Sequence, residues 1–251
     1  MQRYFVTPDQ MTDSTVRITG DDVKHISKVM RMSPGDQVIC SDNQDRVAVC
    51  EIEELNDSSV ELTIVEWSEF ETELPIPVTI AQGLPKHDKL EMIVQKGTEL
   101  GASKFLPFQA SRSIVKWDDK KSRKKTERLL KIIKEAAEQS HRNRMPDCEE
   151  PVSFKQLLSV SEEYSIKVVA YEEEAKQDER SNLAKLLTKI DPSVDRMLVV
   201  IGPEGGLTDE EVERLQEAGF VTCGFGPRIL RTETAPFYIL SAVSYQLELL
   251  R

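Results

Sequence analysis

The sequence predicts an α/β protein in which a small β-rich region precedes a parallel sheet covered by helices on both faces. Residues 1–67 read mostly as short strands with apolar residues at alternate positions. Beyond residue 77, strand-like runs alternate with helical patterns, which is typical of a parallel sheet. An acidic stretch with two prolines, residues 68–77, separates the two regions, and we therefore expect two domains, residues 1–72 and 73–251.

The first region is expected to form a small barrel from five strands and one helix. The strands are expected at residues 3–6, 15–19, 36–40, 47–52 and 60–65. Asp21 or Asp22 can cap the helix, because a carboxylate accepts hydrogen bonds from the free backbone N–H groups of a first turn. The apolar stripe of this helix comprises Val23, Ile26, Val29 and Met30.

The second region is expected to alternate five strands with five helices. The strands are expected at residues 78–81, 104–108, 166–171, 197–201 and 220–225. The first helix presents Leu90, Ile93, Val94, Gly97 and Leu100 on one face. The longest covers residues 118 to about 140 and buries Leu129, Leu130, Ile132, Ile133, Ala136 and Ala137. A third lies near residues 183–187, a capping box at residues 208–211 opens the fourth, and the last runs from near Pro236 to the end of the chain.

Composition excludes several classes of protein. The apolar fraction of 39% and the charged fraction of 31% are ordinary for a globular protein. No apolar run approaches the ~20 residues that span a bilayer, and the first residues lack the apolar stretch of a signal peptide, so we expect a cytoplasmic protein with no membrane partner. Four cysteines without a CxxC pair and only three histidines predict neither a metal site nor a disulfide framework.

One basic segment stands out in an acidic chain. Residues 112–144 hold twelve Lys or Arg and five Asp or Glu, whereas the whole chain has a net charge of −11. A local excess of positive charge favours binding to nucleic acid despite the acidic total. A helix with a solvated lysine face explains the same charges, and charge alone leaves the two interpretations open.

Three strand ends rich in glycine or proline mark a candidate ligand site, at residues 82–85, 201–207 and 225–235. Ligands of parallel sheets bind beyond the carboxyl ends of the strands. Residues 202–207 fit neither the GxGxxG pattern nor a Walker loop, which argues against a nucleotide-dependent oxidoreductase. Glu204 would repel a phosphate and suits a positively charged ligand such as a sulfonium. We expect Gly202, Gly205 and Gly206 to allow close backbone approach and positive φ, although a tight turn also explains them.

The third loop is unusually charged for a segment that leads into an apolar terminal helix. Arg228, Arg231 and Glu233 lie close together in it. Charges beside a core are costly unless they are paired or functional. An internal salt bridge that secures the helix is the alternative interpretation.

Five segments resemble the ribosomal RNA small subunit methyltransferase E family, and the resemblance extends over the whole chain. Gly-Pro-Glu-Gly-Gly-Leu at 202–207 and Gly-Pro-Arg-Ile-Leu-Arg-Thr-Glu-Thr-Ala at 226–235 together are highly specific. Further similarity lies at residues 3–6, 96–101 and 138–146. The sequence departs from the family pattern at His141, where relatives often carry a smaller residue.

This resemblance implies a fold, a reaction and partners. The family belongs to the SPOUT class, which implies a trefoil knot in the C-terminal domain and a PUA-like barrel before it. It also implies a homodimer that uses S-adenosylmethionine to methylate N3 of a uridine in 16S rRNA of the small ribosomal subunit. The alternative that we keep is a non-catalytic RNA-binding assembly factor, which would not bind S-adenosylmethionine.

The resemblance also implies the residues of the cofactor site, and the reaction and the basic helix suggest the others. The knot loops would hold adenosine and methionine largely through backbone groups of Leu84, Pro85, Ile201, Gly202, Pro203, Gly205, Gly206, Leu207, Phe225, Gly226, Pro227, Ile229, Leu230, Thr232 and Glu233. Arg231 is the candidate cation that stabilises the uracil anion, and Glu204 would orient that arginine or accept the proton. Contacts to RNA are expected from Arg3, Lys120, Lys124, Lys131, Lys134, Gln139, Arg142 and Arg144.

Overall fold

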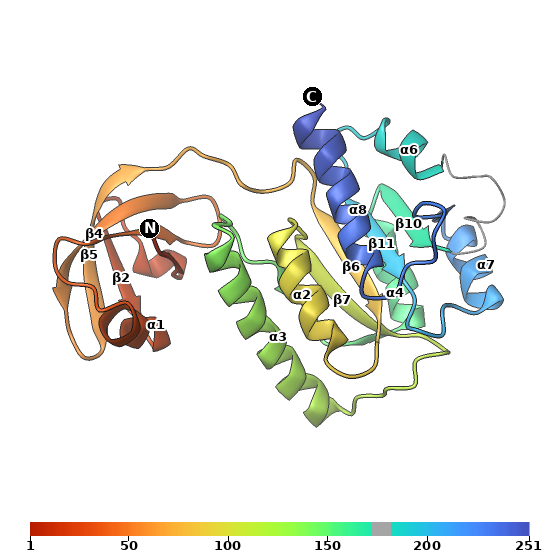
Figure 1. The fold of residues 1–251 in the computed structure, drawn as a ribbon, viewed down its shortest axis with the longest axis horizontal. Coiled ribbons are helices and arrows are strands. Elements are labelled where there is room, and N and C mark those ends of the chain that lie inside the picture. The colour runs from red at the N-terminus through yellow and green to blue at the C-terminus, as the bar shows by residue number, and fades with distance from the viewer. Residues whose placement is uncertain (172–181, 251) are drawn as a thin grey trace. The chain divides into compact units, whose positions relative to one another are not determined.

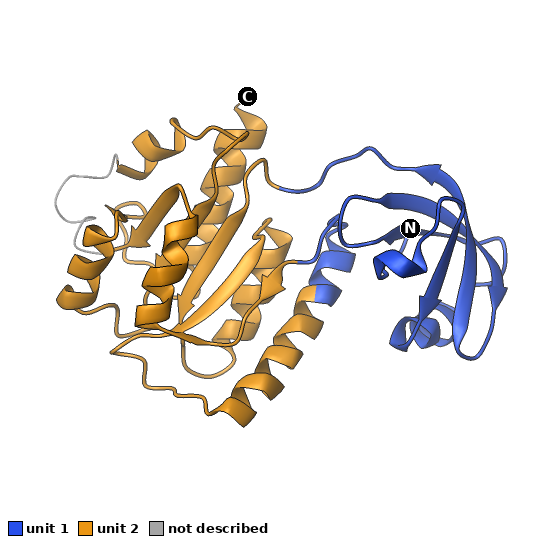
Figure 2. Cartoon of the chain, turned by 180° about the vertical axis from the view of Figure 1, so that it is seen from behind, with its two compact units in different colours: residues 1–73, 134–145 blue, residues 74–133, 146–251 orange. Residues whose placement is uncertain are grey.

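The computed structural model describes residues 1–171 and 182–250, and the chain divides into two compact units. The first unit comprises residues 1–73 and 134–145, and the second comprises residues 74–133 and 146–251 (Figure 2). Segment 134–145 therefore belongs with strands that lie far before it in the chain. The sequence patterns did not predict this assignment, because they place the same residues at the end of one long helix and in the loop after it.

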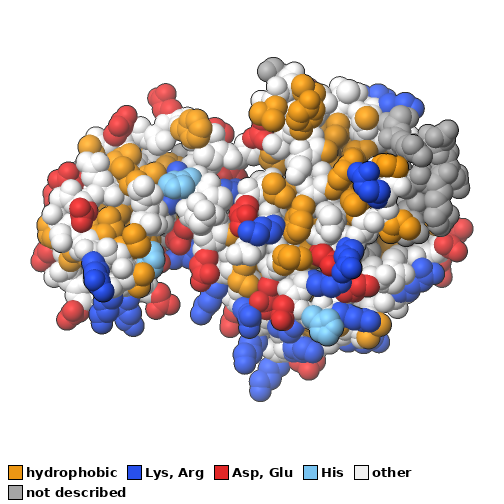
Figure 3. Space-filling view, in the orientation of Figure 1, with side chains coloured by type: hydrophobic (Ala, Val, Ile, Leu, Met, Phe, Trp, Pro, Cys, Tyr) orange, Lys and Arg blue, Asp and Glu red, His pale blue; other side chains and the backbone are white. Residues whose placement is uncertain are grey.

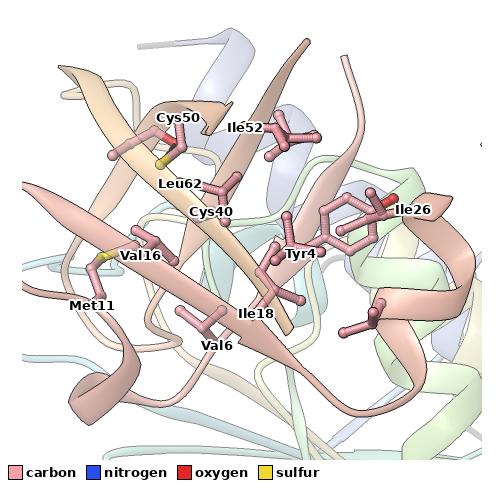
Figure 4. Packing of buried hydrophobic residues seen from close by; sticks show 14 residues of the cluster. Tyr4, Val6, Met11, Val16, Ile18, Ile26, Cys40, Cys50, Ile52 and Leu62 are labelled. Atoms are coloured by element: carbon pink, nitrogen blue, oxygen red, sulfur yellow. Dashed lines mark hydrogen bonds between the residues drawn. The ribbon is translucent and has the colours of Figure 1, made fainter. Parts of the chain in front are cut away.

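The first unit is a five-stranded sheet around its own core. The strand order is β1 (Arg3–Phe5), β3 (Gln37–Ser41), β4 (Val47–Leu55), β5 (Ser59–Trp67) and β2 (Thr15–Thr19). β1 runs parallel to β3, and the other neighbours are antiparallel. Alternate residues point inward, so that Val16, Ile18 and Leu62 meet Tyr4 in the core (Figure 4). All five predicted strands are present, with ends that differ by a few residues.

The helix of this unit differs from its prediction at both ends. Its N-cap is Gly20, without a side-chain cap, and not Asp21 or Asp22 as predicted. α1 (Asp21–Lys24) passes directly into a π-helical turn at His25–Val29. Val23 and Ile26 are buried as predicted, but Val29 is 66% exposed and Met30 38% exposed. A π turn holds more residues than an α turn. The two residues consequently rotate away from the core, which corrects the predicted apolar stripe.

The second unit is built on a parallel sheet. The strand order is β12 (Val221–Cys223), β10 (Ile166–Ala170), β11 (Met197–Ile201), β6 (Val78–Gly83), β7 (Lys104–Gln109) and β8 (Asp147–Cys148), with β9 (Val152–Ser153) also pairing with β7. Every residue of β6 and β11 is buried, which explains the continuous apolar run of β11. The parallel sheet was predicted, whereas β8 and β9 were too short to leave a pattern.

Helices cover both faces of this sheet (Figure 1). α2 (Lys89–Glu99) and α8 (Ala235–Ser244), which ends in a π turn at Tyr245–Leu249, pack side by side. A Cβ on Gly97 of α2 would lie 2.7 Å from the ring of Phe105, so glycine permits this close approach. The opposite face packs against α4 (Phe154–Val160) and α7 (Asp209–Glu217), and α6 (Asn182–Leu187) contacts β12. α4, with its capping box at Ser153 and Gln156, was not predicted.

The long helix α3 (Asp119–Gln139) buries a narrower stripe than expected. Its buried apolar residues are Leu129, Ile133, Ala136 and Ala137. Their spacing of three or four residues keeps them on one face of the helix. Leu130 is 43% exposed and Ile132 only half-buried, so the predicted buried side was too wide. Among the described residues, no helix is both long and apolar enough to cross a membrane.

Candidate cofactor site

Two of the three predicted loops line a cavity of about 850 Å³ in the second unit. They follow β11 and β12 at the carboxyl end of the parallel sheet, where ligands of such sheets bind. The cavity lies within the ~300–1,000 Å³ that is usual for small-molecule sites. The predicted site residues that line it are Ile201, Gly202, Pro203, Glu204, Gly205, Gly206, Leu207, Phe225, Ile229, Leu230, Arg231, Thr232 and Glu233.

The first predicted loop, residues 82–85, is in direct contact with the other two loops. The buried Gln82 donates a hydrogen bond to the Thr232 hydroxyl at 2.9 Å, and that hydroxyl donates to the Gly202 carbonyl at 2.7 Å. A Cβ on Gly83 would lie 2.6 Å from Pro203 Cδ, so the two loops are in close contact. The three loops therefore form one connected unit. The trefoil knot that the resemblance implies stays a prediction.

Four residues predicted to contact the cofactor are placed outside the lining. Leu84 and Pro85 are buried in the first loop. Gly226 and Pro227 lie in the third loop between Phe225 and Arg228, which line the cavity. The contacts of these four residues with the cofactor stay predictions.

Gly206 and Gly202 explain why the second loop is rich in glycine. Gly206 has φ +69°, a conformation that other residues adopt only with strain. A Cβ on Gly202 would lie 3.0 Å from the Gly206 backbone, so the loop closes tightly on itself. Gly202 and Gly205 were also expected to reach positive φ, and this expectation was wrong, because the backbone of both lies outside the left-handed region.

Two carboxylates and one lysine form an ionic cluster at the cavity. Lys89 Nζ lies 3.0 Å from Glu204 Oε1 and 3.0 Å from Glu233 Oε2, and the backbone N–H of Lys86 donates to Glu204 at 3.1 Å. Burial alone would raise the pKa of both glutamates, but hydrogen bonds from their own backbone and from Lys89 outweigh it and lower the pKa. The hydrogen bonds to Glu204 and then Glu233 raise the pKa of Lys89. The cavity thus presents two ionised carboxylates at neutral pH.

Arg231, the predicted catalytic arginine, is exposed and can extend beyond the cavity. The side chain of Arg231 is 83% exposed and lies 4.0 Å from Glu233, its ion-pair partner among the described residues. Glu204 pairs with Lys89 instead, so the structure does not show Glu204 orienting Arg231. An exposed pair at this distance contributes little to stability. α8 is held by its buried apolar residues, which weakens the interpretation of Arg231 as an anchor for that helix.

Three functional residues were missed in the sequence. Lys89 was not singled out, because nothing in its neighbourhood indicated two carboxylate partners from distant loops. Arg112 Nη1 donates to the carbonyls of Gly205 at 3.1 Å and Leu207 at 3.0 Å, which fixes the glycine-rich loop. Glu211, seen only as part of a capping box, is buried and also accepts from the Ser111 backbone at 2.8 Å.

Comparisons with known proteins identify the family. Residues 72–244 match the model of an RNA methyltransferase domain, and residues 18–65 match that of an RNA methyltransferase PUA domain. The ribosomal RNA small subunit methyltransferase E of Bacillus subtilis is 55% identical, over 100% of this chain and 99% of the relative. The chain belongs to the ribosomal RNA small subunit methyltransferase E family. The family match covers both units, so the PUA-like and methyltransferase regions predicted from the resemblance are confirmed.

Solved structures of similar proteins agree with this assignment. The methyltransferase E of Neisseria gonorrhoeae, solved bound to S-adenosyl methionine, superimposes with a TM-score of 0.83 at 27% identity and covers 97% of both chains. A protein solved as hypothetical has a TM-score of 0.92 at 52% identity, with full coverage of both chains. Among the described residues, no group of three His, Cys, Asp or Glu side chains could hold a metal ion.

The basic residues predicted to contact RNA in the first unit are mostly engaged within the protein. Arg3 is buried and donates to the Arg142 carbonyl at 2.6 Å and to Asn143 Oδ1 at 2.7 Å. Arg142 is itself buried against Glu73. Neither guanidinium can reach a phosphate, which corrects both predictions.

The other predicted RNA contacts of this unit differ in exposure. Lys134 donates to both carboxylate oxygens of Asp22 at 2.6 Å, so this lysine is also engaged within the protein and is no longer a candidate for RNA contact. Arg144 donates to Asp45 at 2.7 Å but remains half exposed, and Gln139 is exposed. Of the RNA contacts predicted in this unit, Arg144 and Gln139 remain available to a ligand.

The basic residues predicted in the second unit stand free. Lys120, Lys124 and Lys131 are exposed, and no carboxylate of the described chain lies within ion-pairing distance of them. Lys and Arg side chains gather around the first turns of α3 in the space-filling view (Figure 3). These three lysines therefore remain candidates for phosphate contact.

Proposed function

We propose that this chain transfers the methyl group of S-adenosylmethionine to N3 of a uridine in 16S rRNA of the small ribosomal subunit. The observation that carries the proposal is the cavity between the two loops, with ionised Glu204 and Glu233 at its wall. Membership of the methyltransferase E family supports rRNA of the small subunit as the substrate.

The residues of the cavity fit the cofactor. A sulfonium and an α-ammonium group carry positive charge, which the two carboxylates stabilise. Ile201, Leu207 and Phe225 offer apolar contact to the adenine ring, and the backbone around Gly202 and Gly206 allows close approach. When bound, S-adenosylmethionine supplies an activated methyl group; the protein supplies position and electrostatics.

Arg231 would act on the acceptor. N3 of uracil carries a proton at neutral pH and becomes nucleophilic only as that proton leaves. A cation beside the uracil edge stabilises the negative charge that develops, so its benefit is largest in the transition state. The exposed guanidinium of Arg231 can extend beyond the cavity for this task. The lowered pKa of Glu204 makes it a weak proton acceptor, which favours a role in holding cofactor charge.

The remaining parts of the proposal concern domains and assembly. We assign residues 1–72 to RNA binding and 73–251 to catalysis, and place the enzyme with its ribosomal substrate in the cytoplasm. A homodimer is supported by exposed apolar residues near the C-terminus, where Tyr245, Leu249 and Leu250 are each more than half exposed. Exposed side chains of this kind are typical of interfaces.

Transfer of a tritiated methyl group tests the proposal. Unmodified small subunits are incubated with the protein and labelled S-adenosylmethionine, with large subunits as the matched control. Label should enter the small-subunit RNA alone, and calorimetry should show cofactor binding that survives a metal chelator. The alternative, a non-catalytic assembly factor, predicts RNA binding without cofactor binding or label transfer.

A further inference from the structure

A second candidate site lies beside the cofactor cavity. Side chains of the loop after β6, of α2, of the loop before α3 and of the middle of α3 form a small depression, to which Pro85, His87, Leu90, Trp117, Lys125 and Arg128 contribute. Its volume of about 20 Å³ holds little more than one water molecule. The site therefore cannot enclose a ligand, but it can serve as a platform for a flat group.

Trp117 is the aromatic element of this platform. It stands two residues before α3 and is only partly buried. Lys125 Nζ lies 4.9 Å from the centre of its ring, so a cation already rests on one face. Its indole N–H is shielded, yet no acceptor in the described part of the chain receives it. Tryptophans that serve only as anchors usually donate this hydrogen bond.

Exposed lysines follow Trp117 closely along the chain. Lys120, Lys121 and Lys124 are exposed on the first turns of α3, and no carboxylate of residues 1–171 or 182–250 pairs with them. Arg128, which lines the depression, pairs with Glu91 at 2.7 Å but is itself 67% exposed. An aromatic face beside free cations matches single-stranded RNA, in which bases stack and phosphates require positive charge. A docking site for protein would instead need an apolar centre of larger area.

The platform and the cofactor cavity adjoin each other. Lys89 lines the cavity, and Leu90, the next residue, lines the depression. In the loop before them, the backbone N–H of Lys86 holds Glu204 of the cavity, whereas its neighbours Pro85 and His87 belong to the depression. His87 adopts φ +56°, which turns the chain at this boundary. A nucleotide on the platform would thus be a close neighbour of the methylated nucleotide.

We propose that Trp117 is a stacking platform for an unpaired base of the RNA substrate next to the target uridine, with Lys120, Lys121 and Lys124 on the adjoining phosphates. The identity of the RNA rests on the proposed function, but stacking on Trp117 can be measured without methyl transfer. Stacking would hold the strand while the target base is turned toward the cofactor.

Fluorescence of Trp117 tests the proposal in the full-length chain. Trp67 is the other tryptophan of the sequence, so Trp67→Phe leaves Trp117 as the sole reporter. A short single-stranded oligouridylate should quench Trp117 saturably, whereas an abasic oligomer of the same length should bind without quenching. Trp117→Ala should weaken binding of oligouridylate about tenfold, and Trp117→Phe should retain most of the affinity.

Two controls separate stacking from a purely structural role of Trp117 and from recognition of an acidic protein. If Trp117 only anchors α3, Trp117→Ala lowers the melting temperature, oligouridylate does not quench, and the proposal is overturned. Quenching by polyglutamate, which carries charge without bases, would also overturn it in favour of a protein partner. Label transfer to small subunits reports on the proposed function separately: normal transfer without quenching rejects the platform alone, and quenching without transfer rejects the proposed function alone.

Discussion

The basic residues of the two units are alike in the sequence and differ in the structure. In the first unit, Arg3 and Arg142 are buried and held by partners from the same unit. In the second unit, Lys120 and Lys124 are exposed and have no ion-pair partner in the described chain. Both sets were expected to bind RNA. Arg142 pairs with Glu73 and Arg3 donates to Arg142 and Asn143, so both serve the fold. An exposed cation without a partner remains available to a ligand.

Removal of Arg142 should have the largest effect on stability. Arg142→Ala leaves the carboxylate of Glu73, whose side chain is only 16% exposed, without its buried partner, which should cost about 3 kcal/mol. Urea denaturation followed by a probe in the first unit measures this loss. Arg144→Ala is the matched control, because its pair with Asp45 is exposed and should contribute less than about 1 kcal/mol. Equal losses in both variants would remove the distinction between buried and exposed cations.

Removal of Arg231 should have the largest effect on catalysis. Arg231→Ala should lower turnover about hundredfold with nearly unchanged cofactor affinity, because the cation stabilises charge that develops on the base. Its rate should rise with pH where that of the parent is flat, since hydroxide then removes the N3 proton. A structural role predicts instead a lower melting temperature and no rescue by pH. Parental turnover would exclude the catalytic role.

A buried carboxyl near the end of α3 should make the first unit sensitive to pH. Burial raises the pKa of Glu138 from its ordinary 4.5 to about 7, and Lys134 at 3.4 Å only partly offsets this. The folded state therefore holds a proton that the unfolded chain releases, so the stability it contributes is full below pH 4.5 and is lost as pH rises through 7. The free energy of unfolding should fall by on the order of 1–3 kcal/mol across that range. In Glu138→Gln the fall should disappear.

Substitution of Gly206 should lower both the stability of the fold and the affinity for the cofactor. Gly206→Ala places a side chain at φ +69°, which costs roughly 1–2 kcal/mol. Because the residue lines the cavity, cofactor affinity should drop as well, which calorimetry measures. Gly219→Ala is the control: its φ is +89° and nothing lies within 4 Å of the added Cβ. Gly219→Ala should lose similar stability and keep the parental affinity for the cofactor. If Gly219→Ala also lost cofactor affinity, the loss in Gly206→Ala would be due to backbone strain alone.

The smallest expected effect concerns the salt dependence of RNA binding. Lys120→Gln, Lys124→Gln and Lys131→Gln together should flatten the log–log salt slope by about 0.7–0.9 for each phosphate that the variant no longer neutralises. Lys134→Gln, on the same helix, should leave the slope unchanged because Asp22 already holds that lysine. An unchanged slope in the triple variant would assign these lysines to a solvated face.

The sequence predicted the parts of the structure that local patterns determine. The parallel strands of the second unit and the capping box at Thr208 depend on nearby residues and were predicted. β8 and α4 are too short for a period to develop, and they were missed. The cavity-lining loops were predicted from their glycine- and proline-rich strand ends and then from the resemblance. The contacts of Lys89 and Arg142, in contrast, depend on carboxylates far away in the chain. Glu73 is 69 residues from Arg142, and no local pattern reports such a partner.

The position of the transferred methyl group tests the central claim most directly. A methyl group at N3 blocks the edge of uracil that pairs with adenine, so it stops reverse transcription. After unmodified small subunits are treated with the protein and S-adenosylmethionine, primer extension along 16S rRNA should show one new stop, next to a uridine. Digestion to nucleosides should yield 3-methyluridine. A methyl group on another base or another atom of uracil, or stops scattered over many sites, would contradict the account.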